Sequence, residues 1–338
     1  KPLLIFINPH SGKGKAVRLF DKRVRSILED CKIKHQIFIT KHARHATEYV
    51  KQTPDIAENF SALCTLSGDG LLWEVINGFV DSVEQQTAEL RAIPLPIGII
   101  PGGSGNGLAH SLNSFYYRGG KSSDALVDNT LHVAKGKTVA MDLIRFTCPN
   151  SSVYYGFLSF GWGLMSDIDI ESERLRFLGE ARFTIWSLYR SANTKKYAGT
   201  LCYLPADKVN ASIPPLEAPL TSDWVTVQGP FITVYASILP FLSQKVQFAP
   251  DSRLDDSIIY LLYIREGVSA LKIVQFLVSL EECTHVKLPY VNFLPVRAFR
   301  LIPNGTPSDI MAIDGERIES QPIQAEVMSR AAPILVRP

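Results

Sequence analysis

Several common classes of protein are excluded by features that this sequence lacks. The five cysteines are widely spaced and form no CxxC pair, which argues against a zinc site or a disulfide framework and for reduced thiols in the cytosol. No GxxxxGKS/T segment is present, so the chain has no P-loop. The formal net charge of +2 gives no broad basic surface, and nucleic-acid binding by bulk charge is therefore not expected.

The sequence also lacks an uninterrupted apolar run of about 18 residues, which a membrane-spanning helix requires. The nearest candidate, residues 224–242, is broken by Gln228, Gly229, Pro230 and Pro240, and we predict strands for this segment. Together with the reduced cysteines, this pattern predicts a cytoplasmic protein.

What the sequence does contain indicates two domains, because 338 residues exceed the usual size of one. Over residues 1–140, short apolar runs alternate with stretches whose apolar residues recur at helical spacing. Repeated strand–turn–helix units predict an α/β domain with a mostly parallel sheet, in which ligands bind beyond the carboxyl ends of the strands.

Residues 141–338 have a different pattern, with many short strand-like runs separated by turns. This pattern predicts a mainly antiparallel β-sandwich with a few helices. We predict one helix over residues 171–190 and another over 269–283, where Ser269 is a suitable N-cap. The second helix is apolar nearly all round, so we expect it to be covered on two sides.

Two glycine-rich segments follow predicted strands in the first domain. PGGSGNGLA (residues 101–109) fails the GxGxxG register but frees several backbone N–H groups at a helix N-terminus, which favours phosphate binding over a plain tight turn. In INPHSGKGK (residues 7–15), Gly12 and Gly14 keep the loop open, while the lysines either contact a nucleotide phosphate or solubilise the helix.

A third segment, SGDGLLWEVING (residues 67–78), places Asp69 between Gly68 and Gly70. Asp69 is either a helix N-cap or a catalytic carboxylate that the flanking glycines leave accessible. Glu74 faces either the same site or solvent. Since all three glycine-rich turns follow strands of one predicted sheet, together they favour a nucleotide-binding site.

These three motifs, in this order and spacing, resemble the diacylglycerol-kinase-type catalytic domain of lipid kinases. Residues 160–184 and AIDGER (residues 312–317) extend the resemblance to the sphingosine kinases, so that it covers essentially the whole chain. The first domain is accordingly expected to be similar to phosphofructokinases and NAD kinases, which carry related GDG turns. The active site is expected in a cleft between the two domains.

The resemblance implies ATP- and Mg²⁺-dependent phosphorylation of the primary hydroxyl of sphingosine, with Asp69 as the general base. The residues that match the substrate-binding positions are Ser67, Gly68, Asp69, Gly70 and Asp169. The residues that match the nucleotide-binding positions are Asn8, Pro9, His10, Thr40, Lys41, His42, Ala43, Arg44, Glu74, Gly103, Ser104, Gly105, Arg176, Arg182, Asp314, Gly315 and Glu316. His10 departs from the Arg or small residue of the family pattern.

Physical chemistry agrees with several of these roles. A carboxylate at Asp169 suits the ammonium of a sphingoid base, whereas ceramide and diacylglycerol carry no cation to offset its desolvation. The alternative is that Asp169 or Asp167 only caps a helix. Arg176 and Arg182 either offset phosphate charge or form ion pairs with nearby acids on a solvated helix face.

The resemblance also requires an apolar place for the lipid tail. The predicted helix 269–283 can form one wall, and the candidates for the remainder are Phe160, Leu164, Met165, Ile168, Phe183 and Phe293. His285 is interpreted as structural. Residues 183–190 and the lysines at 13 and 15 either contact a membrane surface reversibly or belong to ordinary core and surface.

Two other functions remain open at this point. One is a ceramide or diacylglycerol kinase of the same superfamily. The other is a non-catalytic protein that binds a nucleotide or a membrane. Neither the oligomeric state nor the ligands of Mg²⁺ follow from the sequence.

Overall fold

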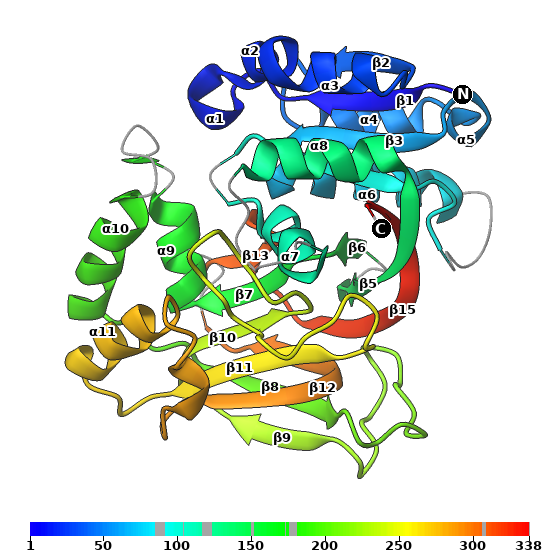
Figure 1. Ribbon diagram of the computed structural model, residues 1–338. Coiled ribbons are helices and arrows are strands. Elements are labelled where there is room, and N and C mark those ends of the chain that lie inside the picture. Colours follow the sequence, from blue (N-terminus) through cyan, green and yellow to red (C-terminus); the bar gives the residue numbers. More distant parts are fainter. Residues whose placement is uncertain are drawn as a thin grey trace. The chain divides into compact units, whose positions relative to one another are not determined.

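The computed structural model describes residues 1–84, 92–103, 105–116, 124–149, 152–172, 174–175, 181–305 and 309–337 (Figure 1). The chain forms two compact units. The first consists of Lys1–Leu143 together with Ser329–Pro338, and the second consists of Ile144–Met328. The first unit thus includes a C-terminal segment that the sequence division assigns to the second domain.

The first unit is built on a parallel sheet, as the alternating pattern predicts. Its neighbouring strands, in spatial order, are β2 (His35–Ile39), β1 (Leu3–Ile7), β3 (Ala62–Ser67) and β4 (Ile97–Pro101). The end of β15 (Ile323–Val336) adds a further parallel strand, in which Ile334 pairs with Ile97. The carboxyl ends of β1, β2, β3 and β4 therefore lie at one edge of this sheet.

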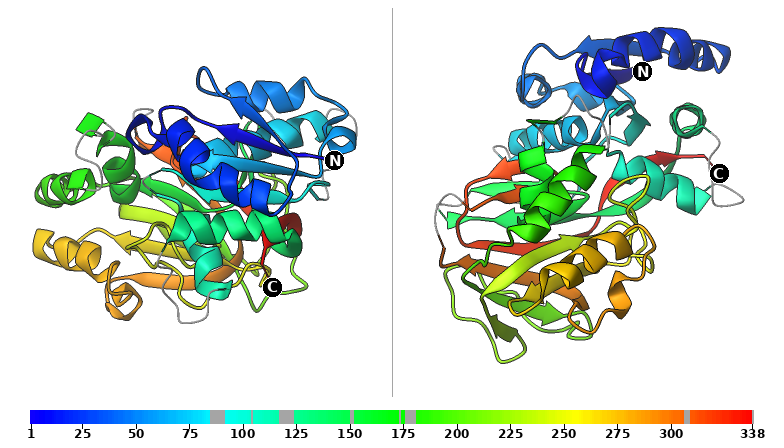
Figure 2. Two further views of the ribbon diagram at one scale, coloured as in Figure 1. Left: turned by 45° about the horizontal axis from the view of Figure 1, so that its top comes forward. Right: turned by 90° about the vertical axis from the view of Figure 1, so that its left-hand side faces the viewer.

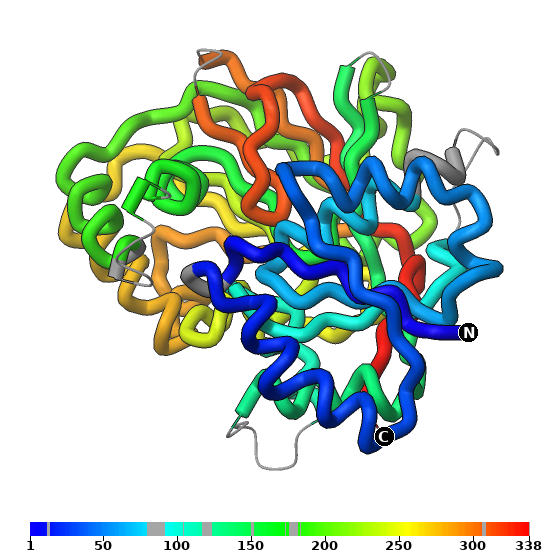
Figure 3. Tube along the Cα trace, turned by 90° about the horizontal axis from the view of Figure 1, so that it is seen from above, coloured from blue at the N-terminus to red at the C-terminus, as the bar shows by residue number. Residues whose placement is uncertain are grey.

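Helices cover both faces of this sheet, and the residues of β1, β3 and β4 are buried at nearly every position. The helical elements of the first unit are α1 (Ser11–Gly14), α2 (Ala16–Leu19), the π-helical η1 (Phe20–Val24), α3 (Arg25–Asp30), α4 (His45–Lys51), α5 (Ile56–Asn59), α6 (Asp69–Glu84), α7 (Gly107–Tyr116) and α8 (Ala125–Lys135). Figure 3 follows the chain from β1 into α1–α3 as the dark-blue tube.

The alternation of side chains along β1 assigns the helices to the two faces. Ile5 belongs to a buried cluster with Phe20 and Leu28 of the N-terminal helical segment and with Val133 of α8. Phe6 points to the other face, where its ring lies 5.8 Å from that of Tyr49 in α4. Both faces are thus buried, which explains why the strands read as continuous apolar runs.

The second unit is rich in antiparallel strands. One run of neighbours consists of β7 (Ser159–Gly163), β10 (Phe231–Ser237), β11 (Ile259–Arg265), β12 (Asn292–Pro303), β8 (Gly199–Pro205) and β9 (Val225–Gln228). β12 also pairs with β15, and further strand pairs involve β5 (Lys137–Thr147), β6 (Val153–Gly156), β13 (Met311–Ile313) and β14 (Glu316–Ile318). The predicted fold class, an α/β unit followed by an antiparallel one, is confirmed.

Three helices gather at one end of the second unit, and Figure 2 shows α10 beside α11. They are α9 (Leu164–Ser172), α10 (Ala181–Ala192) and α11 (Ala270–Ser279). The prediction of one continuous helix over residues 171–190 is wrong, because Arg174 and Leu175 form a 3₁₀ turn. A continuous helix would hold Glu171 about 28 Å from Arg190, whereas their side chains form an ion pair.

The expectation that α11 is covered on two sides is also wrong within this chain. Ile273, Phe276 and Leu280 are buried, but Leu271 is 83% exposed and Val278 is 56% exposed. The helix therefore packs through one face and presents apolar side chains on the other. No helix in the described ranges is both long and apolar enough to cross a bilayer.

Candidate active site

The three glycine-rich segments of the first unit come together, because each follows one of three neighbouring parallel strands. The N–H of Gly102, after β4, donates to the carbonyl of Ser67 at the end of β3 over 2.8 Å. The hydroxyl of Ser67 lies 2.5 Å from that of Ser11, which begins α1 after β1. Hydrogen bonds thus join all three segments at the carboxyl edge of the sheet.

The turn after β3 and the loop after β4 approach so closely that only glycine fits between them. A Cβ on Gly103 would lie 2.5 Å from the Cα of Gly68 and 2.6 Å from its nitrogen. Real side chains do not tolerate such distances, so an alanine at 103 requires the two backbones to move apart. The pair of glycines is therefore part of the packing of this site.

Asn106 holds the end of the loop after β4. Its side-chain nitrogen donates to the carbonyl of Gly103 over 2.7 Å, and its side-chain oxygen accepts the Gly103 N–H at 3.2 Å. Asn106 adopts a left-handed backbone conformation with φ of 57°, which asparagine tolerates better than most residues. This loop leads directly into α7. Ser104, a predicted nucleotide contact within it, lies outside the described residues.

Asp69 is the first residue of α6, and its side chain also reaches the first residue of α7. Its Oδ2 accepts a hydrogen bond from the N–H of Gly107 over 2.8 Å, and the residue is only 7% exposed. The other carboxylate oxygen, Oδ1, accepts no hydrogen bond from any residue that the structure describes. One oxygen therefore positions the carboxylate while the second remains able to take a proton.

Burial raises the pKa of Asp69 to about 6 from its ordinary value of 3.8, because desolvation disfavours the charged form. Hydrogen bonds from the backbone of Gly107 and its neighbours oppose this change without cancelling it. A carboxylate with a pKa close to neutrality is ionised at pH 7 and accepts a proton more readily than an ordinary aspartate. These properties suit a general base.

The second predicted nucleotide loop connects β2 to α4 at the same edge of the sheet. The N–H of Thr40 donates to the carbonyl of Ile7 over 2.9 Å, which places this loop beside the one after β1. Its remaining predicted residues, Lys41, His42, Ala43 and Arg44, are exposed.

Two other predicted nucleotide contacts make hydrogen bonds close to these loops. A carboxylate oxygen of Glu74 accepts the N–H of Ala46 at 3.3 Å, so Glu74 faces the start of α4. The side chain of Asn8 accepts the N–H of His10 at 2.9 Å, which shapes the turn after β1. Both side chains thus hold loop backbone in place.

In the second unit, Asp169 lies on α9 close to the β13–β14 turn. Its Oδ2 is 3.5 Å from the point that a Cβ on Gly315 would occupy. Gly315 has φ of 81° in this turn, a conformation that favours glycine. Two positions that the sequence assigns to different ligands, Asp169 to the lipid and Gly315 to the nucleotide, are therefore neighbours.

Asp314 holds the β13–β14 turn against the segment that enters β7. Its carboxylate accepts the backbone N–H groups of Phe157, Leu158 and Ser159 over 2.8–3.0 Å, and it is 4% exposed. Its carboxylate is thus engaged in anchoring the segment that enters β7. The neighbouring Glu316 is exposed.

Of the two predicted arginines, one lies in the part of the chain that the structure describes. Arg182 is buried, with 5% exposure, near the start of α10. Arg176 lies outside the described residues.

Several of the predicted lipid-tail residues gather in one apolar cluster. Leu164, Met165, Ile168 and Phe293 pack with Ile273 and Phe276 of α11. Phe160 does not join them, because its ring packs against Phe146 and Phe299. The side chain of Phe183 lies outside the described part of the structure.

His285 is a structural residue, in line with its interpretation from the sequence. Its Nε2 lies 2.9 Å from the carbonyl of Phe248, and its ring stacks on that of Phe248. Burial lowers its pKa, so the imidazole is held neutral.

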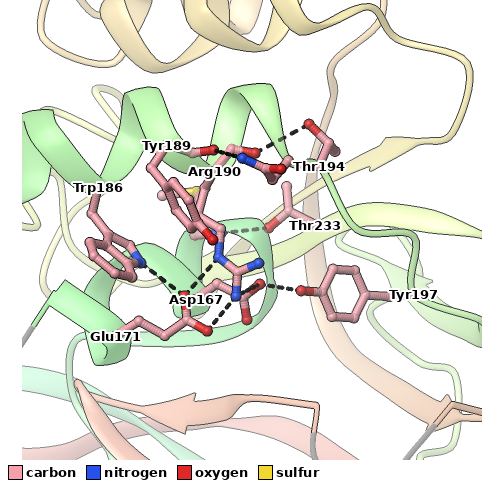
Figure 4. A network of polar contacts seen from close by, with 10 residues as sticks. Asp167, Glu171, Trp186, Tyr189, Arg190, Thr194, Tyr197 and Thr233 are labelled. Atoms are coloured by element: carbon pink, nitrogen blue, oxygen red, sulfur yellow. Dashed lines mark hydrogen bonds and ion pairs between the residues drawn. The ribbon is translucent and has the colours of Figure 1, made fainter.

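Sequence reasoning missed a polar network around Arg190, which Figure 4 shows. Arg190 contacts both Glu171 and Asp167 of α9. Two acids spaced four residues apart were the available signal, but the partner on a separate helix has no local pattern.

The raised pKa of Asp69 leads to a prediction for stability. Since its folded-state pKa exceeds the unfolded value, folding favours the protonated form, and stability declines as pH rises from about 4 through about 6. The unfolding free energy of the protein minus that of Asp69→Asn should fall by roughly 3 kcal/mol over this interval and then level off. Urea unfolding at a series of pH values measures this difference.

Asp124→Asn serves as a control of opposite sign. Burial opposes ionisation of Asp124, but hydrogen bonds from Arg23 and Val127 outweigh it and lower its pKa. The unfolding free energy of the protein minus that of Asp124→Asn should therefore rise with pH. A flat profile for Asp69→Asn would contradict the electrostatic description of Asp69.

Comparison with known proteins agrees with this arrangement. Residues 2–146 match the diacylglycerol kinase catalytic domain. The chain is 34% identical to sphingosine kinase 1 of Rattus norvegicus, over 96% of this chain and 88% of the relative. It is 33% identical to sphingosine kinase 1 of Homo sapiens, with the same coverage.

Among solved structures, the fold resembles that of a diacylglycerol kinase from Bacillus anthracis str. Sterne. The TM-score is 0.62 at 14% identity, and the match covers 100% of this chain and 97% of that one. The likeness supports the fold, while the sequence relatives define the family and confirm the resemblance noted from the motifs. The chain therefore belongs to the sphingosine kinase family of lipid kinases.

Proposed function

We propose that this enzyme transfers the γ-phosphoryl group of ATP to the primary hydroxyl of sphingosine, giving sphingosine 1-phosphate. The observation that carries this proposal is Asp69, a buried carboxylate at the place where three glycine-rich segments meet. One of its oxygens is held by Gly107, and the other accepts no hydrogen bond from a described residue. Membership of the sphingosine kinase family supports the choice of a sphingoid base as acceptor.

In this proposal Asp69 is the general base. The lipid hydroxyl oxygen attacks the γ-phosphorus as its proton passes to Oδ1 of Asp69, and the bond from phosphorus to the β–γ bridging oxygen breaks to release ADP. The hydrogen bond from Gly107 to Oδ2 keeps the accepting oxygen oriented during the transfer. The proton then leaves Asp69 for solvent.

The loops at the carboxyl edge of the first sheet are the proposed nucleotide site. Gly103 leaves no room for a Cβ against the backbone of Gly68, so backbone rather than side chains forms this surface, which suits close approach of phosphate oxygens. We assign the phosphates to Gly103, Ser104 and Gly105, and further contacts to the loops containing Asn8 and Thr40 and to Glu74. In the second unit, Arg176, Arg182 and the 314–316 turn are assigned to the nucleotide.

Mg²⁺ fits this site as an ion carried mainly by the nucleotide. No three His, Cys, Asp or Glu side chains form a cluster in the described ranges, so these residues offer no complete set of protein ligands. Mg²⁺ commonly keeps several waters and binds through one or two carboxylates and substrate phosphates. When bound, it would neutralise charge on the transferred phosphoryl group.

Asp169 is the proposed partner of the lipid ammonium. It is half-buried on α9, beside the apolar cluster that contains Leu164 and Ile168 of the same helix. An ammonium group compensates the desolvation of this carboxylate, and an uncharged head group does not. This favours a sphingoid base over ceramide or diacylglycerol.

We also propose reversible binding to a membrane surface through α10 and α11. Ile185, Leu188 and Tyr189 of α10 are 47%, 58% and 54% exposed, and α11 presents Leu271 and Val278. Exposed apolar side chains on adjacent helices suit shallow insertion at a bilayer interface, where the lipid substrate resides.

A lipid panel with radiolabelled ATP tests the proposed reaction. We expect sphingosine to be labelled, and Asp69→Asn to remain folded while kcat falls by about 10²–10⁴-fold, because the proton acceptor is lost. Asn106→Ala, which loosens the neighbouring loop but keeps Asp69, serves as the comparison and should be less impaired. Near-normal turnover by Asp69→Asn would exclude the proposed base, while labelling of ceramide or diacylglycerol alone would indicate the other lipid kinases.

The role of Asp169 is tested by Asp169→Asn, which keeps the shape and removes the charge. We expect KM for sphingosine to rise by about 10–100-fold, corresponding to the loss of one charge-assisted interaction, with little change in KM for ATP. Steady-state kinetics with both substrates measures this. Unchanged kinetics with sphingosine would remove Asp169 from the head-group site.

Membrane binding is tested by flotation with anionic vesicles. The double variant Ile185→Ser, Leu188→Ser should lose binding by about tenfold or more, because two exposed apolar anchors are removed. Val209→Ser removes a similarly exposed apolar side chain from a loop of the same unit and should bind as the unaltered protein does. Equal losses of vesicle binding in the double variant and in Val209→Ser would argue against a specific membrane-binding surface on α10.

A further inference from the structure

Arg190 forms a buried polar network that joins α10 to α9 (Figure 4). Its Nε donates to Glu171 over 2.7 Å, and its Nη2 contacts Glu171 and lies 3.1 Å from Asp167. The Trp186 indole N–H donates to Glu171 over 2.8 Å, and the Tyr197 hydroxyl donates to Asp167. One guanidinium thus serves two carboxylates, each of which has a second donor.

The network is largely removed from water. The side chains of Arg190, Asp167 and Glu171 are 7%, 3% and 18% exposed. Buried carboxylates depend on such partners, because an unpaired charge in this setting is costly. Loss of the guanidinium would leave two acids of α9 next to each other without the cation that contacts both of them, and we expect α9 to shift in response.

The position of Asp169 on α9 makes such a shift relevant to the substrate. Asp167 and Glu171 are four residues apart and lie on the same face of the helix. Asp169 lies two residues from each, about 200° around the axis. The network therefore holds one face of α9 while the opposite face directs Asp169 toward Gly315.

The start of α9 is held independently of this network. The hydroxyl of Thr233 donates to the carbonyl of Trp162 over 3.3 Å, just before α9 begins. Gly163 follows with φ of 91°, and a Cβ there would lie 2.6 Å from the carbonyl oxygen of Ile232. Since the N-terminal end is anchored by β7 and β10, Arg190 mainly controls the rotation and C-terminal end of the helix.

We propose that Arg190 is a positioning residue for substrate recognition, which orients Asp169 toward the lipid ammonium by holding Asp167 and Glu171 on the opposite face of α9. This inference rests on the proposed function, because it assigns Asp169 to the head group. Arg190 itself contacts neither substrate in this account. Its effect should accordingly appear only through Asp169.

A double-mutant cycle tests this dependence. Arg190→Met keeps a long apolar stem and removes the charge, and we expect KM for sphingosine to rise by about tenfold, as misplacement of a positioned group does, while KM for ATP changes by less than about twofold. In an Asp169→Asn background, the same substitution should add less than about twofold, because the group that it positions is absent.

Two further variants separate positioning from general destabilisation. Lys196→Met breaks the neighbouring surface pair with Glu266, 2.8 Å apart, and should leave both KM values unchanged. Tyr197→Phe removes only the hydrogen bond to Asp167 and keeps the ring, so it should show the same dependence on Asp169 with a smaller effect. This second cycle tests the network if Arg190→Met does not fold.

The outcomes are distinct. The positioning role would be overturned if the rises in KM for sphingosine caused by the Arg190 and Asp169 substitutions multiply in the double variant. It would also be overturned if Arg190→Met raises KM equally for both substrates. In either case the proposed function stands. Absence of sphingosine turnover by the unaltered chain would overturn the proposed function, and this inference with it. Loss of the Arg190 or Tyr197 effect in the Asp169→Asn background supports the proposal.

Discussion

The hydrogen bond from the Gly107 N–H to Oδ2 of Asp69 is the interaction on which the catalytic part of this structure depends. It joins the turn after β3 to the helix after β4 and commits one oxygen of the carboxylate. The same junction requires glycine at 103, since the backbone of Gly68 leaves no room for a Cβ there. Burial of the carboxylate raises its pKa to about 6, and the hydrogen bond from Gly107 opposes that rise without cancelling it. The junction thus fixes the position of the carboxylate, while desolvation sets its basicity.

The acids of the second unit differ in what their carboxylates contact. Asp314 accepts three backbone N–H groups, and Asp167 is held by Arg190 and Tyr197. Both carboxylates thus hold neighbouring segments of the chain in place. Asp169, between Asp167 and Glu171 in sequence but on another face of α9, lies beside Gly315. Acids close together in sequence therefore reach different surroundings through helix geometry.

Much of the fold could be predicted, because its signals are local. Alternating strand and helix patterns indicate the parallel α/β unit, and loops that follow adjacent parallel strands must meet at one edge. The convergence of the three glycine-rich segments follows from that rule. The hydrogen-bond partner of Asp69 does not follow from it, because Gly107 is 38 residues away. Whether Asp69 caps α6 or contacts α7 depends on backbone distances that the local sequence does not record.

The failures of the sequence analysis have a common cause in tertiary contacts. The break between α9 and α10 and the pairing of Glu171 with Arg190 depend on two helices packing together, which no local pattern records. The exposed face of α11 was predicted to be buried, because an apolar helix was assumed to find partners within the chain.

The most direct test of the central claim is a crystal structure with sphingosine and a non-hydrolysable ATP analogue. If Asp69 is the general base, the primary hydroxyl of the lipid should lie about 2.6–3.2 Å from Oδ1 of Asp69, with Oδ2 still accepting the Gly107 N–H. A hydroxyl bound by a different side chain, with Oδ1 turned away from it, would contradict the account.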